Sequence, residues 1–141
     1  MKNTKSGVLE DLRVDVRVKL AALWAAELFL QANGDIIEFF RAGVLKDFLA
    51  GKTSGIEISQ GILLGMSAYV LIPTAMVFLS LVLKPVWNRW TNIVLGAAYV
   101  LSVVALTIGE TWAYYIFLSI AESVLLLVIV WYAWRWPRLS A

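Results

Sequence analysis

Residues 58–83, ISQGILLGMSAYVLIPTAMVFLSLVL, decide the fold. No charged side chain stands between Glu57 and Lys84. A helix needs about 20 mostly apolar residues to cross the ~30 Å hydrocarbon core of a bilayer, so this stretch predicts a membrane-spanning helix. Pro73 lies near its middle, where it bends the helix and frees one backbone carbonyl. We expect neighbouring helices to satisfy that carbonyl.

The composition of the whole chain agrees with a membrane protein. Of its 141 residues, 61% are hydrophobic and 16% are charged, whereas soluble domains have about half and a quarter. There is no cysteine or histidine, which removes thiol nucleophiles, disulfides, imidazole metal ligands and the usual general base. We therefore expect no enzyme, no cofactor and no metal centre. The net charge of +2 is too small to indicate a nucleic-acid partner.

Three further stretches are long and apolar enough to span a membrane. We expect an all-α fold in which residues 1–141 form one domain, an antiparallel bundle of four transmembrane helices. Only a few residues around Gly109 separate the last two helices, so these form a tight hairpin. The four spans are expected at approximately 18–40, 58–83, 92–108 and 112–134.

The basic residues predict the orientation, because Lys and Arg are enriched on the cytoplasmic side. Nine lie on the side of both termini and three on the other. Both termini are therefore expected in the cytoplasm, in a multi-pass protein of the bacterial cytoplasmic membrane surrounded by lipid. The nine are Lys2, Lys5, Arg13, Arg17, Lys19, Lys84, Arg89, Arg135 and Arg138, and the three are Arg41, Lys46 and Lys52.

Two segments outside the spans have patterns of their own. From Leu12 to Leu20, apolar and charged residues alternate strictly, which suits an extended segment on the membrane surface; an interfacial helix is the alternative. In the outer loop 41–57, four apolar residues at helical spacing precede Gly51, which predicts a short helix lying on the membrane. These four are Val44, Leu45, Phe48 and Leu49.

Two glutamates, Glu27 and Glu122, fall deep inside the first and last spans. Counting ~1.5 Å per residue from the helix starts places each about 13 to 15 Å into the membrane. An ionised carboxylate there costs at least ~2.5 kcal/mol, and two at one depth cannot both stay charged without a partner. Either one is protonated near neutral pH, or a cation bridges them. The structural alternative is that each protonated acid donates a hydrogen bond that holds the helices in register.

Each predicted span carries one polar face. At 100° per residue, Glu27, Gln31, Asp35 and Glu38 fall within an arc of about 80° on the first span. Four such faces converging on one axis predict a polar-lined interior, which is a pocket or a path. The other members are Gln60, Ser67 and Thr74 on the second span, Asn92 and Tyr99 on the third, and Tyr115, Ser119 and Glu122 on the fourth.

Several short motifs together resemble an uncharacterised family of bacterial four-helix integral membrane proteins. They cover nearly the whole chain, and the resemblance implies the fold and the membrane location but no activity. The motifs are Leu20-x-x-Leu23-Trp24, Gly34-Asp35 with Glu38, Gln60-Gly-Ile-Leu-Leu-Gly65, Ile72-Pro73, Phe78-Leu79-Ser80-Leu81, Asn88-Arg89-Trp90-x-Asn92 and Ile129-Val-Trp131-Tyr-Ala-Trp134-x-Trp136-Pro137.

The chain is more loosely similar to small multidrug-resistance transporters. These also have four short helices and a membrane-embedded Glu in the first, which is near Ala25-Ala26-Glu27 here. The chain departs from them in its second buried Glu, its longer first outer loop and its lack of their aromatic motif in the second helix.

Three functions remain open on the sequence alone. The first is a proton- or cation-coupled transporter or small channel in which Glu27 and Glu122 form the exchange site. The second is an accessory membrane protein that packs against a larger complex or binds a lipid or a hydrophobic cationic ligand. The third, which the lack of His and Cys disfavours, is an intramembrane enzyme that uses carboxylates and tyrosine as acid and base. A homodimer suits a transporter, because four short helices alone make a thin one.

Overall fold

The computed structural model describes residues 13–137, which form five helices and one short β-hairpin. The two strands of the hairpin pair antiparallel. The elements are α1 (Val16–Glu38), α2 (Val44–Leu49), β1 (Lys52–Thr53), β2 (Ile56–Glu57), α3 (Gln60–Val82), α4 (Pro85–Thr107) and α5 (Ala113–Trp134).

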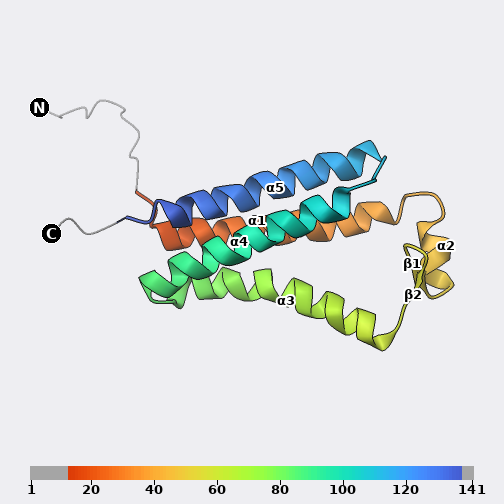
Figure 1. The fold of residues 1–141 in the computed structure, drawn as a ribbon, viewed down its shortest axis with the longest axis horizontal. Coiled ribbons are helices and arrows are strands. Elements are labelled where there is room, and N and C mark those ends of the chain that lie inside the picture. Colours follow the sequence, from red (N-terminus) through yellow and green to blue (C-terminus); the bar gives the residue numbers. More distant parts are fainter. Residues whose placement is uncertain (1–12, 138–141) are drawn as a thin grey trace, which may run out of the picture.

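Three of the helices, α3, α4 and α5, are long and apolar enough to cross a membrane. They indicate a helical membrane protein. Helix α1 is equally long at 23 residues and lies in the same bundle, where it packs against α3 and α5 (Figure 1). Its acidic and basic residues make it more polar than the other three. Its role as a fourth span therefore remains a proposal.

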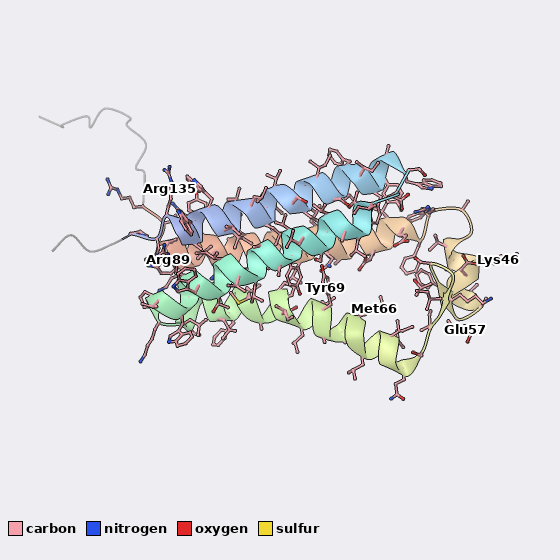
Figure 2. All side chains as sticks on the ribbon, in the orientation of Figure 1. Lys46, Glu57, Met66, Tyr69, Arg89 and Arg135 are labelled. Atoms are coloured by element: carbon pink, nitrogen blue, oxygen red, sulfur yellow. The ribbon has the colours of Figure 1, made fainter. Side chains whose placement is uncertain are left out.

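The four long helices alternate in direction along the bundle (Figure 1). We name the two ends by what they carry. The Lys84 end holds the turn between α3 and α4 together with the start of α1 and the end of α5, and Val16 and Trp136 both pack against the core there. The α2 end holds α2, the β-hairpin and the turn between α4 and α5. Figure 2 shows Arg89 and Arg135 at the Lys84 end and Lys46 and Glu57 at the α2 end.

The helix bounds agree with three of the predicted spans to within two residues. The exception is α4, which begins at Pro85 rather than near residue 92. Proline suits the first position of a helix, because its fixed φ is helical and its missing N–H has no helical partner there. Only Leu83 and Lys84 thus separate α3 from α4.

The expected extended segment from Leu12 to Leu20 is wrong from Val16 onward, where α1 has already begun. Asp15 caps this helix, and its Oδ1 accepts a hydrogen bond from the backbone N–H of Arg17 at 2.8 Å. A cap of this kind stabilises a helix start by about 1 kcal/mol and outweighs the period-two pattern. Leu12 lies outside the described residues.

The loop between α1 and α3 contains the expected short helix, α2, and Gly51 follows it with φ of 73°. That positive φ is accessible to glycine without strain. The position of α2 on a membrane surface stays a prediction. The β-hairpin after it was not predicted, since its strands have only two residues each.

The apolar core fills the half of the bundle nearer the Lys84 end. Helix α4 approaches α5 closely because Gly96 has no side chain, and a Cβ there would lie 2.8 Å from Cγ2 of Val130. The half nearer the α2 end is packed more loosely and contains the cavity described next. The fully buried apolar side chains of the core are Leu20, Trp24, Met76, Leu126, Ile129 and Ala133.

Candidate functional site

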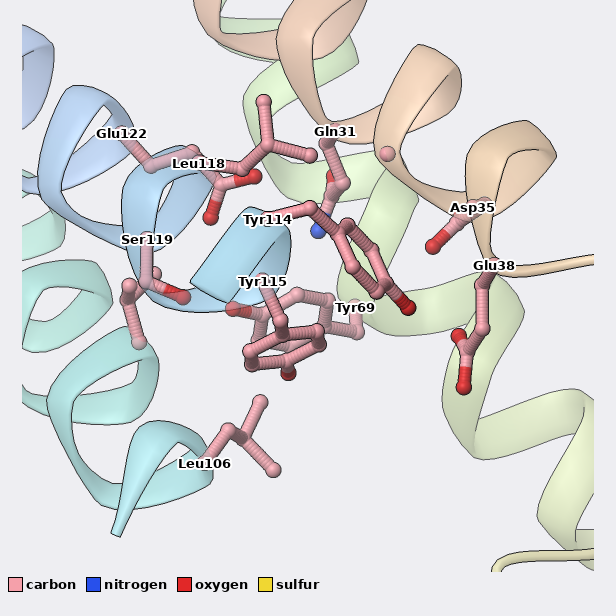
Figure 3. A pocket seen from close by; sticks show the side chains of 12 residues that line it. Gln31, Asp35, Glu38, Tyr69, Leu106, Tyr114, Tyr115, Leu118, Ser119 and Glu122 are labelled. Atoms are coloured by element: carbon pink, nitrogen blue, oxygen red, sulfur yellow. The ribbon is translucent and has the colours of Figure 1, made fainter. Parts of the chain in front are cut away.

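A cavity of about 120 Å³ lies between the long helices in the half of the bundle nearer the α2 end. Helices α1 and α5 supply most of its wall, while Tyr69 comes from α3 and Val103 and Leu106 from α4 (Figure 3). The remaining lining residues are Gln31, Gly34, Asp35 and Glu38 from α1 and Tyr114, Tyr115, Leu118, Ser119 and Glu122 from α5.

Three of the lining residues are acids, and they come from two helices. Asp35 and Glu38 lie on the α1 side of the cavity and Glu122 on the α5 side, with tyrosine rings between them (Figure 3). Within the lining, all of which belongs to the described residues, no side chain is basic. Because nothing in the wall offsets the acids, the cavity favours a positively charged occupant or protonated carboxyls.

Glu27 lies one helical turn deeper than Gln31 on the face of α1 that lines the cavity. Its side chain is 3% exposed, and its Oε2 has no hydrogen-bond partner within residues 13–137. Glu122 is near enough to interact with it electrostatically. The two glutamates predicted as a pair therefore occupy one region, with Glu122 on the cavity wall and Glu27 beneath the wall. Their joint role stays a prediction.

Toward the Lys84 end, the cavity meets a layer of tyrosines. Tyr69 stacks on Tyr99 with ring centroids 4.7 Å apart, and its hydroxyl lies 2.8 Å from Oγ of Ser102. The Tyr99 hydroxyl donates to the backbone carbonyl of Tyr69. Since Pro73 has no N–H, that carbonyl lacks its partner in α3, and Tyr99 supplies the replacement. This contact confirms the expectation drawn from Pro73.

Beyond the tyrosines, a buried network of polar side chains joins α1, α3 and α4. Trp24 Nε1 donates to Asn92 Oδ1 at 2.7 Å, and Asn92 Nδ2 donates to Asn88 Oδ1 at 2.7 Å. Asn88 in turn donates to the backbone carbonyl of Ser80 at 2.6 Å. Every one of these side chains is fully buried. Together with the apolar core, the network fills the bundle between the cavity and the Lys84 end.

At the α2 end the cavity continues into a wider vestibule of about 520 Å³. Glu38, Leu106 and Tyr115 line both spaces. The vestibule is bordered by charged residues of both signs from the loop and the α4–α5 turn, namely Arg41, Asp47, Lys52 and Glu110. The acid-lined cavity is thus accessible from the α2 end and closed toward the Lys84 end.

An ion pair ties the end of α1 to the turn between α4 and α5. Arg41 donates to Glu110 Oε2 at 3.0 Å and lies over the ring of Trp112 at 4.7 Å. Oε1 of Glu110 accepts the backbone N–H groups of Thr111 and Trp112 at 2.7 and 3.0 Å. The Trp112 N–H first, and then Arg41, lower the pKa of Glu110 below its ordinary value. The hydrogen bond to Glu110 raises the pKa of Arg41.

A comparison with protein families assigns the chain. The model of a family of unknown function, DUF6326, matches residues 13–140. The chain belongs to DUF6326. This confirms the resemblance to an uncharacterised family, whereas the comparisons show no similarity to small multidrug-resistance transporters. No curated protein and no solved structure matches the chain.

The predicted polar faces of this DUF6326 chain are only partly brought together. Those of α1 and α5 meet at the cavity through Gln31, Asp35, Glu38, Tyr115, Ser119 and Glu122. Asn92 and Tyr99 of α4 are buried but belong to the two networks below it.

The predicted polar face of α3 does not contribute to the cavity wall. Gln60, Ser67 and Thr74 are exposed and do not line the cavity. The hydroxyls of Ser67 and Thr74 each donate to the carbonyl four residues earlier, at 2.8 Å. Because its own backbone satisfies a Ser or Thr hydroxyl, such a residue can lie on an apolar helix without facing a polar interior.

The prediction missed six lining residues, namely Gly34, Tyr69, Val103, Leu106, Tyr114 and Leu118. Tyr69 had a signal in the sequence, since it stands four residues before Pro73 and so owns the carbonyl that the proline frees. Tyr114 directly precedes the predicted Tyr115, and its hydroxyl is buried without a partner within residues 13–137. Leu118 stands four residues before Glu122 and shares its helix face.

Within residues 13–137, no three His, Cys, Asp or Glu side chains are placed to hold one metal ion. Arg41 pairs with Glu110 rather than with Glu38, so Glu110 is already engaged. The arrangement suits a proton or a monovalent cation better than a divalent ion, which needs six or more oxygen ligands.

Proposed function

We propose that this chain is a four-span membrane protein whose acid-lined cavity binds and exchanges a proton, as part of a proton-coupled transporter. Glu27 and Glu122 are the exchanging groups. The observation that carries the proposal is the Glu27 carboxyl, beneath a cavity that has acids and no bases in its wall. Its side chain is 3% exposed, and its Oε2 has no hydrogen-bond partner among residues 13–137.

The proposed proton exchange follows from the different surroundings of Glu122 and Glu27. Glu122 lines the cavity and exchanges protons with water that enters through the vestibule. Glu27 is buried, and an uncompensated charge there costs several kcal/mol, so its protonated form is favoured. A proton passed from Glu122 to Glu27 is held below the cavity until the packing around it changes.

The one-sided access favours a carrier over an open channel. A continuous channel needs a polar path at both ends, whereas here Trp24, Asn92 and the apolar core occupy the Lys84 half. A carrier alternates between states open to either side. We propose that α1 is the fourth span and that α2 lies on the membrane surface. We also propose that the Lys84 end faces the cytoplasm of a bacterium, since it carries most of the basic residues within residues 13–137.

The test is proton uptake and proton flux in the same reconstituted protein. Infrared difference spectra recorded on raising the pH are expected to show loss of a protonated carboxyl band, and Glu27→Gln removes that band. Proteoliposomes with an internal pH dye are expected to show a flux that Glu27→Gln abolishes. Glu57→Gln, at an exposed acid on β2, leaves both signals unchanged. A Glu27→Gln variant with wild-type spectra and flux would show that Glu27 exchanges no proton.

A groove between α1 and α3 favours a second function, the binding of a hydrophobic cationic ligand from the bilayer. It has a volume of about 350 Å³ and meets the cavity at Gln31 and Asp35, so an apolar tail in the groove places a positive head beside Asp35. Its other lining residues are all apolar, namely Ala25, Leu28, Phe29, Ala32, Val70 and Val77.

Filling the groove separates the two functions. Ala32→Phe is expected to expel a retained ligand, detected by mass spectrometry of the gently extracted protein, without stopping proton exchange at Glu27. Ala26→Phe is the matched control, because Ala26 is exposed on the same helix and does not line the groove. An equal amount of ligand in both variants would place the ligand elsewhere.

A further inference from the structure

Basic side chains at the Lys84 end lie on aromatic rings. The Arg89 guanidinium is 5.6 Å from the ring centroid of Trp90 and 5.7 Å from that of Trp134, which brings α4 and α5 together around one cation. We call these three residues the Arg89 clamp. Arg135 lies 5.2 Å from the ring centroid of Trp131, and Figure 2 shows Arg89 and Arg135 at the same end of the bundle.

The Arg89 clamp holds a cation without an anion. The one ion pair within residues 13–137 is Arg41 with Glu110 at the opposite end of the bundle. Nε of Arg89 is buried and has no hydrogen-bond partner in the same part of the chain. A guanidinium that has lost part of its hydration without gaining an acceptor favours an anion at its remaining N–H groups.

The position of the clamp along the helix indicates which anion is near. Arg89 stands four residues after Pro85, where α4 begins, which is about 6 Å along the axis. Arg89 also stands three residues, about 4.5 Å, before the predicted span 92–108. Because the polar headgroup layer on each side of a bilayer is about 5 to 8 Å thick, that span puts Arg89 at the level of the lipid phosphates. Trp90 and Trp134 are half or more exposed, as expected for indole rings that anchor a helix in this layer.

We propose that the Arg89 clamp is a binding site for the headgroup phosphate of an anionic phospholipid. The guanidinium donates two parallel hydrogen bonds to phosphate oxygens, and the indole rings of Trp90 and Trp134 fix its plane and pack against the glycerol and upper acyl chains. Arg135 adds a second positive charge that favours an anionic over a zwitterionic headgroup. The site depends on α4 and α5 being membrane helices and not on proton exchange in the cavity.

The experiment is a titration of the detergent-purified protein with phosphatidylglycerol, in which native mass spectrometry counts the bound lipids. Wild type is expected to retain one lipid tightly, and Arg89→Gln to weaken that binding about tenfold, the effect of losing a hydrogen-bonded charge. Lys84→Gln is the matched control, since it removes one charge at the same end from an exposed side chain that makes no capping hydrogen bond. It is expected to change binding less than twofold. Arg89→Lys keeps the positive charge but loses the two parallel donors of the guanidinium. Its lipid affinity is expected to lie between those of wild type and Arg89→Gln.

Three results would overturn the proposal. Equal losses in Arg89→Gln and Lys84→Gln would mean that only overall charge attracts the lipid. Equal binding of phosphatidylcholine and phosphatidylglycerol would remove the preference for an anionic lipid. Competition by millimolar inorganic phosphate would identify the ligand as a soluble anion. Thermal unfolding of each variant, measured without added lipid, shows that the variants compared are folded.

Discussion

The hydroxyl of Tyr99 on α4 donates to the backbone carbonyl of Tyr69 on α3, the one carbonyl that Pro73 leaves without a helical partner. This contact lies between the cavity and the closed half of the bundle. Tyr99 also packs edge-on against Trp24 of α1, with ring centroids 6.0 Å apart. One side chain thus joins α3, at the carbonyl that Pro73 frees, to α1 and α4, and it lies against Tyr69 of the cavity wall.

Tyr99→Phe is expected to destabilise the protein by about 1–3 kcal/mol, the cost of leaving a buried carbonyl unsatisfied. Pro73→Ala gives residue 73 a backbone N–H that can donate to the Tyr69 carbonyl. The free energy of unfolding lost in Tyr99→Phe should therefore be smaller in the Pro73→Ala background. A double-mutant cycle from chemical unfolding in detergent measures this coupling. Additive effects of the two substitutions would mean that Tyr99 does not replace the partner lost to Pro73.

Gly96→Ala is expected to destabilise the contact between α4 and α5. The new Cβ would lie 2.8 Å from Cγ2 of Val130, and a β-branched side chain has little freedom to move away. Overpacking of this kind costs about 1–3 kcal/mol. Gly65→Ala is the matched control, because a Cβ there meets nothing within 4 Å and alanine favours a helix. Thermal unfolding should therefore separate the two variants, and Val130→Ala should restore stability to Gly96→Ala.

The long helices were predictable because their signal is apolar length, which does not depend on tertiary contacts. The cavity was predictable where it is built from one face of α1 and one of α5, since Glu27, Glu122 and their neighbours have no way to be satisfied alone in an apolar helix. The orientation of the polar face of α3 could not be predicted, because the hydroxyls of Ser67 and Thr74 donate to backbone carbonyls of their own helix. Helical phase locates polar side chains around an axis but does not give the neighbour that each one meets.

The same limit applies to ion pairs at the helix ends. Helical spacing alone offers Glu38, one turn away, as a partner for Arg41, whereas the fold brings Glu110 to Arg41 from 69 residues further along the chain. The geometry of the α4–α5 turn explains this pairing, since the backbone N–H groups of Thr111 and Trp112, just before α5, already hold Glu110 in place. Local spacing contains no information about such a distant partner.

The Arg41–Glu110 pair should make stability depend on acid pH. The pKa of Glu110 is lowered from its ordinary value of 4.5 by the Trp112 N–H and by Arg41. A carboxyl whose pKa is lower in the folded than in the unfolded state stabilises the fold at any pH above its unfolded pKa. That stabilisation is lost as the pH falls through the folded pKa. Unfolding measured at neutral pH should therefore show Glu110→Gln less stable than wild type, with the difference vanishing in acid. A difference that persists at low pH would assign the effect to packing.

Asn92→Ala is expected to cost more than the loss of one hydrogen bond. Asn92 accepts from Trp24 Nε1 at 2.7 Å and donates to Asn88 Oδ1 at 2.7 Å, all within the closed half of the bundle. Its removal leaves a donor and an acceptor unpaired where water does not reach, each at about 1–3 kcal/mol. Thr91→Ala, one residue earlier and partly exposed, serves as the control in chemical unfolding. If the network seals the cavity floor, proteoliposomes of Asn92→Ala also leak protons in the absence of any substrate, and Glu27→Gln does not.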